Sequence, residues 1–127
     1  MLVVDASVVV DFLLDPDRLR ERLRAGGDDL HAPSHLDVEV LSALRRLAQR
    51  GTLTEGRARG AADDLADLPV TRYDVTPLLR RSWQLREQVG AYDAPYIALA
   101  EALDATLLTR DERLARTAGH TARVEAV

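Results

Sequence analysis

Four acidic residues occupy positions from which their carboxylates could act together, although they are far apart in the sequence. Two follow short apolar runs and two lie in the first turns of expected helices; they are Asp5, Asp111, Glu39 and Asp93. In a parallel α/β topology, the carboxyl ends of strands and the first turns of the following helices meet at one edge of the sheet. Such a cluster is compatible with carboxylates neutralised by bound divalent cations.

Each acid also has a simpler explanation when it is considered alone. Asp5, Asp93 and Asp111 each precede an expected helix and could be N-caps, whose side chains accept hydrogen bonds from backbone N–H groups. Glu39 lies at the border of an apolar helix face, where it needs a partner such as an arginine or a metal. Ser7 could cap a helix or hold a ligand carboxylate in place.

The residue types exclude several other chemistries. The chain has no cysteine and no lysine, so disulfides, thiol nucleophiles, lysine Schiff bases and the lysine of a phosphate-binding P-loop are absent. The three histidines, His31, His35 and His120, do not have zinc-ligand spacing and are interpreted as polar surface or strand-end residues. The net charge of −4 argues against passive binding of nucleic acid.

Length and composition favour one folded domain that spans residues 1–127. Hydrophobic residues make up 46% and charged residues 30% of the chain, a globular balance. No apolar run approaches the roughly 20 residues that span a bilayer, so no membrane association is expected. The apolar start at residues 1–4 is too short for a signal peptide, and a cytoplasmic protein is expected.

Short apolar runs alternate with longer helical stretches, which predicts an α/β fold. The expected fold is a single domain with a short parallel sheet flanked by helices on both faces. The predicted strands are 2–4, 30–32, 70–73, 106–108 and 122–127. The predicted helices are 7–14, 16–25, 34–50, 54–68, 76–89, 93–103 and a short one from 111.

Several helix ends carry specific signals. Ser34 and Asp37 have the spacing of a capping box, with aspartate in place of the usual glutamate. Gly26 and Gly27 are expected to end the second helix, and Gly51 the third. Thr76 is an expected N-cap with proline at the first helical position.

Four stretches together resemble the motifs of PIN domains, above all the VapC-type toxin ribonucleases of bacterial toxin–antitoxin pairs. They are Val3-Val4-Asp5-Ala6-Ser7, Asp37-Val38-Glu39-Val40-Leu41, Tyr92-Asp93-Ala94-Pro95-Tyr96 with the apolar helix to Glu101, and Leu107-Leu108-Thr109-Arg110-Asp111-Glu112-Arg113-Leu114. The resemblance covers essentially the whole chain in order. It implies that Asp5, Glu39, Asp93 and Asp111 are catalytic and bind Mg²⁺ or Mn²⁺, and that Ser7 and Thr109 support them.

The same resemblance implies an endoribonuclease that cleaves RNA with metal-activated water. It also implies a homodimer and a cognate, VapB-like antitoxin. Pro95 departs from the ordinary helix former expected there, but the first turn tolerates proline. Arg113 occupies a position where some PIN domains have a further acid, which argues against a strong second metal site.

Three other functions remain as alternatives. The chain could be a PIN-fold housekeeping RNA-processing nuclease without an antitoxin, or a non-catalytic RNA-binding module. A phosphatase or phosphoacceptor with Asp5 as nucleophile usually needs a lysine, which is absent, and often a second aspartate where this chain has Ser7.

Three aromatic residues have two possible roles each. Tyr92 and Tyr96 could stack on RNA bases or pack in the core. Trp83 could belong to the core or to a dimer interface.

Overall fold

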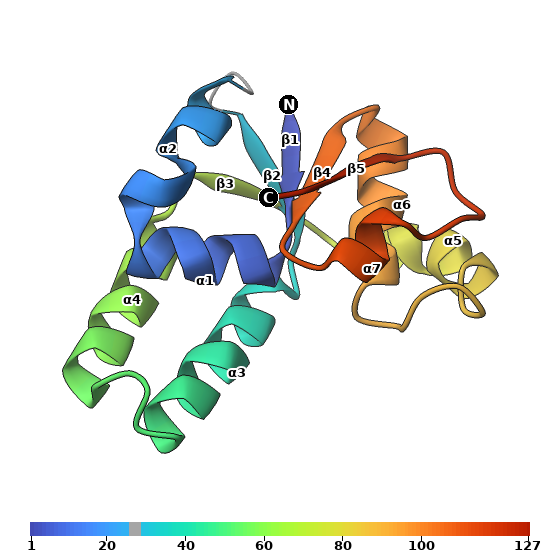
Figure 1. Ribbon diagram of the computed structural model, residues 1–127. Helices are drawn as coiled ribbons and strands as arrows, with labels where there is room; N and C mark the ends of the chain where they lie inside the picture. Colours follow the sequence, from blue (N-terminus) through green and yellow to red (C-terminus); the bar gives the residue numbers. More distant parts are fainter. Residues whose placement is uncertain (26–28) are drawn as a thin grey trace.

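Five parallel strands form the centre of the protein in a computed structural model, which describes residues 1–25 and 29–127 (Figure 1). The strands are β1 (Leu2–Val4), β2 (Leu30–Pro33), β3 (Val70–Tyr73), β4 (Thr106–Thr109) and β5 (Arg123–Ala126). They lie in the order β3-β2-β1-β4-β5, and every neighbouring pair is parallel. The predicted parallel α/β sheet is therefore confirmed, and all five strands end at the same edge.

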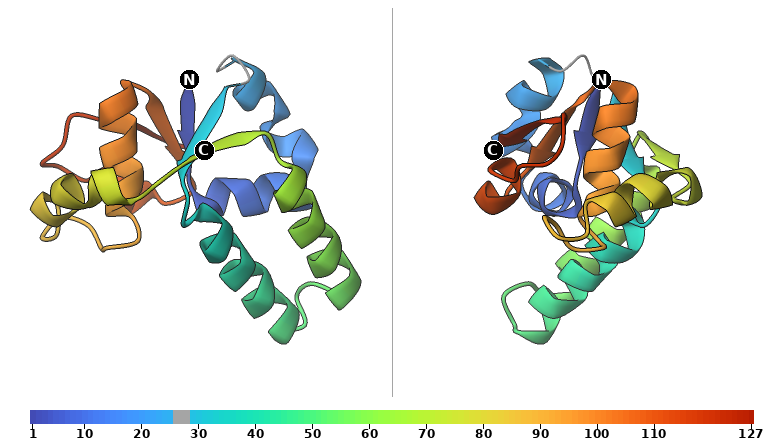
Figure 2. Two further views of the ribbon diagram at one scale, coloured as in Figure 1. Left: turned by 180° about the vertical axis from the view of Figure 1, so that it is seen from behind. Right: turned by 90° about the vertical axis from the view of Figure 1, so that its right-hand side faces the viewer.

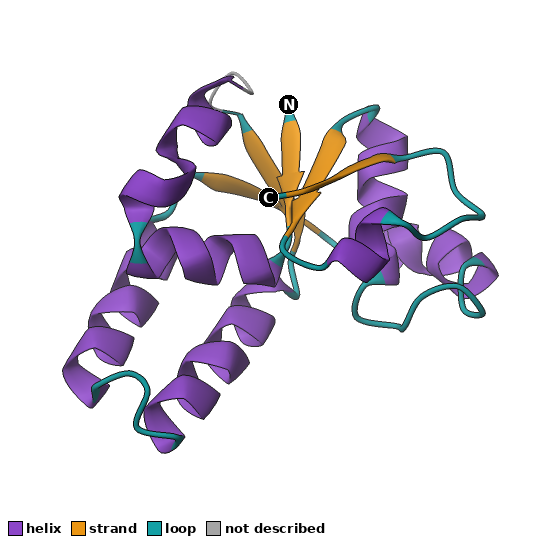
Figure 3. Ribbon diagram, in the orientation of Figure 1, coloured by secondary structure: helices purple, strands orange, loops and turns teal. Residues whose placement is uncertain are grey.

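Helices cover both faces of this sheet, as predicted (Figures 2 and 3). They are α1 (Ala6–Leu14), α2 (Pro16–Ala25), α3 (Leu36–Gln49), α4 (Glu55–Asp67), the 3₁₀ turn η1 (Thr76–Leu78), α5 (Leu79–Gln84), α6 (Ala94–Leu103) and α7 (Glu112–Ala115). In Figure 2, α6 lies on one face of the sheet and α1 with α2 on the other, while α3 and α4 form a hairpin that extends past the carboxyl edge.

The central elements are apolar because they are enclosed on all sides. Every residue of β1 is buried, as are Leu107 and Leu108 of β4. The first seven residues of α6, Ala94 to Ala100, are all buried between the sheet and its neighbours. A helix that is apolar around its whole circumference is typical of such a position.

Arg72 of β3 fastens the α3–α4 hairpin to the sheet. Its guanidinium donates to both carboxylate oxygens of Asp37 and to the carbonyls of Leu65, Leu68 and Val70. The carbonyl of Leu65 belongs to the last turn of α4, where carbonyls lack the usual i+4 partner within the helix. The arginine thereby fixes the direction in which α3 leaves the sheet.

This contact makes the predicted capping box wrong. Helix α3 begins at Leu36, and its N-cap residue makes no side-chain cap hydrogen bond. Asp37 binds Arg72 in a charge-assisted, two-pronged contact, which is stronger than a neutral hydrogen bond to the backbone. The backbone N–H of Ser34 donates to the carbonyl of Tyr73 instead.

The predicted helix 76–89 is also wrong at both ends. The segment opens as a 3₁₀ turn at Thr76–Leu78, and α5 ends at Gln84. The N–H of Leu85 is shared between the carbonyls of Arg81 and Ser82. Such tightening into a 3₁₀ turn often ends a helix.

Two other expectations concern helices. The predicted stop of the second helix at Gly26 and Gly27 lies outside the described residues. Within the described ranges, no helix is long and apolar enough to cross a membrane.

Glu101 of α6 joins three distant segments. Its carboxylate accepts hydrogen bonds from Arg81 Nε of α5 at 2.8 Å and from the backbone N–H of Thr121 at 2.9 Å. The hydrogen bond from Arg81 is the largest influence, and it outweighs burial to lower the pKa of Glu101 to about 2. A lowered carboxylate pKa stabilises the fold above the ordinary value of 4.5, and this stabilisation is lost as the pH falls toward 2.

We therefore expect Glu101→Gln to lower the free energy of unfolding at pH 7 by about 1–2 kcal/mol, a figure reduced for the partial exposure of Arg81. Urea unfolding at a series of pH values measures this difference, which should shrink below pH 4.5. Glu112→Gln is the matched control, because Glu112 is exposed and its ion pair among the described residues is with Arg116, just after the end of α7. If the difference in free energy of unfolding between wild type and Glu101→Gln stayed constant down to the lowest pH at which the protein folds, this role for Glu101 would be contradicted.

Candidate active site

The four predicted acids line one pocket at the carboxyl edge of the sheet. β1 and β4 are neighbours with Val4 opposite Leu108, so the residues that follow them, Asp5 and Asp111, come close together. The first turn of α3 and the start of α6 add the other two acids. The pocket has a volume of about 170 Å³ and is lined by Asp5, Ala6, Ser7, Glu39, Asp93, Tyr96, Asp111 and Leu114.

Asp5 is buried and held by three donors. The hydroxyl of Ser7 donates to Oδ1 at 2.6 Å, and the hydroxyl of Thr109 donates to Oδ2. The N–H of Val8 also donates to Oδ1, so Asp5 is the N-cap of α1 as well as a member of the site. Burial raises the pKa of Asp5 despite these hydrogen bonds. The predicted supporting residues, Ser7 and Thr109, therefore contact the carboxylate they were expected to support.

The loop between β4 and α7 is tied to α1 by contacts that the sequence did not indicate. The backbone N–H of Arg110 donates to Ser7 Oγ at 2.9 Å, and its guanidinium pairs with Asp11 at 2.6 Å. Within the loop, the N–H of Asp111 donates to Thr109 Oγ1. A chain of hydrogen bonds therefore connects Asp5 to the loop that carries Asp111.

Glu39 is held by an aromatic residue and a histidine. The phenol of Tyr96 donates to Glu39 Oε1 at 2.7 Å, and His35 Nε2 lies 3.2 Å from the same oxygen. The arginine partner considered for Glu39 is not found among the described ion pairs, so that alternative is wrong. Burial, with the neighbouring carboxylates, raises the pKa of Tyr96, which keeps the phenol protonated and able to donate.

His35 is a member of the site that sequence reasoning missed, because all three histidines were assigned to surface or strand-end positions. It lies one helical turn before Glu39, a spacing at which side chains on a helix meet. Burial lowers the pKa of His35, but the hydrogen bonds to Glu39 and the Tyr92 carbonyl and the nearby negative charge outweigh it, so the pKa is raised overall. The i, i+4 spacing was the available signal.

Asp93 stands at the N-cap position of α6, yet its side chain makes no cap hydrogen bond. The simple capping explanation for this residue is therefore wrong. Burial is the main cause that raises the pKa of Asp93, followed by the negative charges of Glu39, Asp5 and Asp111. The four acids are thus close enough for their charges to repel one another.

Asp111 acts both as an N-cap and as a member of the acidic site. Its Oδ1 accepts hydrogen bonds from the N–H groups of Arg113 at 2.8 Å and Leu114 at 3.4 Å, which caps α7. Its carboxylate also lines the pocket with the other three acids. The capping explanation and membership of the site are therefore compatible for Asp5 and Asp111.

The residues present fit a hard divalent cation that retains much of its water. All four are oxygen donors, and their mutual repulsion favours a bound positive charge. A volume of about 170 Å³ has room for an ion with several waters, since each water occupies about 30 Å³. As the described side chains stand, no group of three or more acids or histidines surrounds a single ion directly. A divalent ion held by one or two carboxylates directly, and by the others through waters, would agree with the volume of the pocket and with the absence of a closer ligand group among the residues described.

The aromatic residues separate into two groups. Tyr96 is only 1% exposed and belongs to the core around Glu39, which confirms the packing alternative for it. Tyr92 and Trp83 are 71% and 69% exposed, so Trp83 does not belong to the core. Pro95 is accommodated in the first turn of α6, as expected.

Comparison with known proteins agrees with this geometry. The PIN domain family model matches residues 2–120. Ribonuclease VapC9 of Mycobacterium tuberculosis is 45% identical over 117 residues, which cover 92% of this chain and 91% of that protein. Ribonuclease VapC12 of the same organism is 38% identical over 128 residues, covering 100% of this chain and 99% of the relative.

Solved structures share the fold at low sequence identity. The VapBC2 complex of Rickettsia felis, bound to a promoter DNA fragment, matches with a TM-score of 0.71 and 14% identity over 99% of this chain and 98% of the other. VapC20 of Mycobacterium tuberculosis, a toxin that cleaves the sarcin-ricin loop, matches with a TM-score of 0.61 and 18% identity over 84% and 87% of the two chains. By its sequence relatives and by the domain model that spans nearly its whole length, the chain belongs to the PIN domain family, within the VapC ribonucleases.

Proposed function

We propose that this protein is a metal-dependent endoribonuclease and the toxin of a bacterial toxin–antitoxin pair. The observation that carries the proposal is the set of four carboxylates that line one pocket at the carboxyl edge of the sheet. Relatives that carry the name VapC ribonuclease match almost the whole chain at 38–45% identity, which supports RNA as the substrate.

In this proposal Asp5, Glu39, Asp93 and Asp111 hold Mg²⁺ or Mn²⁺. The bound ion would supply an activated water as nucleophile and offset the negative charge that develops on the scissile phosphate. Ser7 and Thr109 orient the carboxylate of Asp5, and Tyr96 orients that of Glu39. Such supporting hydrogen bonds fix the direction of ligand oxygens and tune their basicity.

The partners in this proposal are an RNA substrate, a second copy of the chain and a VapB-like antitoxin, all in the cytoplasm. The structural neighbours include VapBC complexes from Rickettsia felis and Salmonella typhimurium, which favours a toxin over a housekeeping nuclease. A non-catalytic RNA-binding role is disfavoured because it gives no reason to keep four repelling acids in one pocket.

Inducible expression in a bacterial host tests the proposal. We expect wild-type protein to arrest growth within the induction period and to generate new RNA ends at a small set of sequences. Asp93→Asn should permit growth. Asp104→Asn, which removes an exposed carboxylate at the opposite end of α6, should arrest growth like wild type. Co-expression of the protein encoded immediately upstream should relieve the arrest if it is the antitoxin.

Two outcomes would count against parts of the proposal. Growth arrest by Asp93→Asn equal to wild type would contradict the assigned active site. Specific RNA cleavage in the purified protein without any growth arrest, and without an effect of the upstream protein, would favour the housekeeping nuclease.

A further inference from the structure

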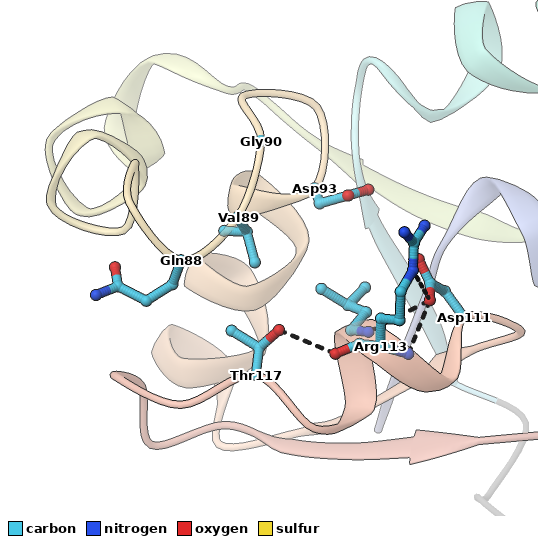
Figure 4. Close-up of a pocket in the computed structure, with 8 residues that line it drawn as sticks. Gln88, Val89, Gly90, Asp93, Asp111, Arg113 and Thr117 are labelled. Carbon is cyan, nitrogen blue, oxygen red and sulfur yellow. Dashed lines mark hydrogen bonds and ion pairs between the residues drawn. The ribbon is translucent and has the colours of Figure 1, made fainter.

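A second hollow continues outward from the acidic pocket. It has a volume of about 340 Å³ and shares Asp93, Asp111 and Leu114 with the acidic pocket. Its other walls come from the segment after α5, from α7, and from Thr117, two residues beyond the end of α7 (Figure 4). The remaining lining residues are Gln88, Val89, Gly90, Arg113 and Thr117. This hollow therefore adjoins two of the four acids on the side that faces solvent.

Arg113 supplies the only positive charge among the residues that line this hollow. Its side chain is 92% exposed, and its Nε lies 3.5 Å from Asp111 Oδ1. In Figure 4 the guanidinium extends toward the gap between Asp93 and Asp111. Among the hydrogen bonds of the described residues, none is donated by this guanidinium, although the backbone N–H of Arg113 donates to Asp111 Oδ1, the N-cap of α7.

The contact between Arg113 and Asp111 is therefore loose and easily exchanged. An exposed ion pair at this distance contributes little to stability, and Asp111 Oδ1 already accepts two backbone hydrogen bonds. By contrast, the nearby Arg110 is committed to Asp11 at 2.6 Å. Of these two arginines, only Arg113 could move to another partner without breaking a short ion pair.

An arginine beside an acidic pocket can have either of two anionic partners. The guanidinium forms strong, two-pronged contacts with phosphates as well as with carboxylates. Overall the protein is acidic, with a net charge of −4, so an RNA strand that approaches the four acids meets repulsion. A cation at the mouth of the pocket reduces that repulsion at the place where the strand must enter.

We propose that Arg113 is an exchangeable cation of the active site, which lies beside Asp111 in the RNA-free protein and turns to a backbone phosphate of the RNA when the strand enters the adjoining hollow. This inference rests on the proposed function. In the RNA-free state the guanidinium competes with a divalent ion for the same acids. With RNA bound, it holds a phosphate next to the acidic pocket.

The proposed exchange predicts that a single substitution changes RNA binding and Mn²⁺ binding in opposite directions. In Arg113→Gln, the loss of a phosphate contact should weaken RNA binding by about five- to tenfold and reduce the salt dependence by about one counterion. The loss of a competing positive charge should tighten Mn²⁺ binding to the RNA-free protein by about two- to fivefold. An arginine that acts only through the overall charge would change both quantities by less than twofold, and a purely structural one would not change them in opposite directions.

Both titrations can be made without any cleavage. Binding of a short fluorescein-labelled single-stranded RNA of mixed sequence is followed by anisotropy in the presence of chelator, at several salt concentrations. Mn²⁺ binding to the RNA-free protein is followed by calorimetry. Arg116→Gln is the matched control, because it removes the same charge from an exposed arginine next to α7 that pairs with Glu112 and does not line the hollow.

The expected result is weaker RNA binding and tighter Mn²⁺ binding in Arg113→Gln, with less than a twofold change of either in Arg116→Gln. Arg113→Lys, which keeps the charge but loses the planar fork, should recover only part of the RNA affinity. If Arg113→Gln behaves like Arg116→Gln in either titration, the exchange is refuted while the proposed nuclease function stands. If wild-type protein neither binds Mn²⁺ nor cleaves RNA, the proposed function fails, and the exchange with it.

Discussion

Asp93→Asn is expected to lower the rate of RNA cleavage by about 10²–10³-fold while leaving the fold unchanged, since charge stabilisation at the reacting phosphate is typically worth that much. Asparagine has nearly the shape of aspartate but lacks the charge that attracts a cation. The Asp93 side chain makes no cap hydrogen bond, so its replacement removes no backbone contact. The loss of activity should therefore not be accompanied by loss of structure.

The measurement compares purified variants on total RNA with Mn²⁺, together with circular dichroism to monitor the fold. Asp104→Asn is the matched control, because Asp104 is 90% exposed and adopts a left-handed conformation that asparagine also tolerates. Glu39→Gln and Asp111→Asn should lose activity similarly. Full activity in both Asp5→Asn and Asp93→Asn would exclude the assigned site.

Asp5→Asn should differ from Asp93→Asn in its effect on stability. The Asp5 carboxylate accepts hydrogen bonds from Ser7, Val8 and Thr109. An asparagine amide nitrogen cannot accept a hydrogen bond, so one of these donors loses its partner in a buried position. The two variants therefore separate the role of charge in the site from the role of hydrogen bonding in its support.

The framework of the fold was predictable because its signals are local. The buried strands β1 and β4 appear as short continuous apolar runs, and α6 as an apolar helix that follows a turn. A parallel sheet then brings the residues after β1 and β4 to one edge. Asp5 and Asp111 could be brought together from the sequence for this reason alone.

Apart from the contacts of Ser7 and Thr109 with Asp5, which the family resemblance implied, most supporting contacts were not predictable, because they join residues that are distant in the chain. Tyr96 and Glu39 are 57 positions apart, and Arg110 and Asp11 are 99 positions apart. Arg72 takes Asp37 away from its predicted capping role across 35 positions. No periodicity indicates which of several arginines will meet which acid, since that depends on how the helices pack. The contacts of Ser7 with Asp5 and of His35 with Glu39 join residues close in sequence, and only the second of these two was missed.

Millimolar Mg²⁺ or Mn²⁺ is expected to raise the melting temperature of the wild-type protein by about 3–6 °C, which corresponds to roughly 1 kcal/mol for a domain of this size. The reason is that an ion held by the converging acids binds the native state and has no comparable site in the unfolded chain. The pKa of Asp93, raised by burial and then by the charges of Glu39, Asp5 and Asp111, reflects a repulsion that a bound cation would relieve.

The same repulsion predicts that Asp93→Asn melts at an equal or higher temperature than wild type without metal, and responds less to metal. No cap hydrogen bond is lost at Asp93 to offset the gain. Asp111→Asn is an independent check, because asparagine keeps the cap of α7 while removing one charge. Thermal melts of wild type, both variants and the Asp104→Asn control, with and without metal at fixed ionic strength, measure these differences. If four separate surface carboxylates were the correct description, metal would leave the wild-type melt unchanged and neither substitution would stabilise the metal-free protein.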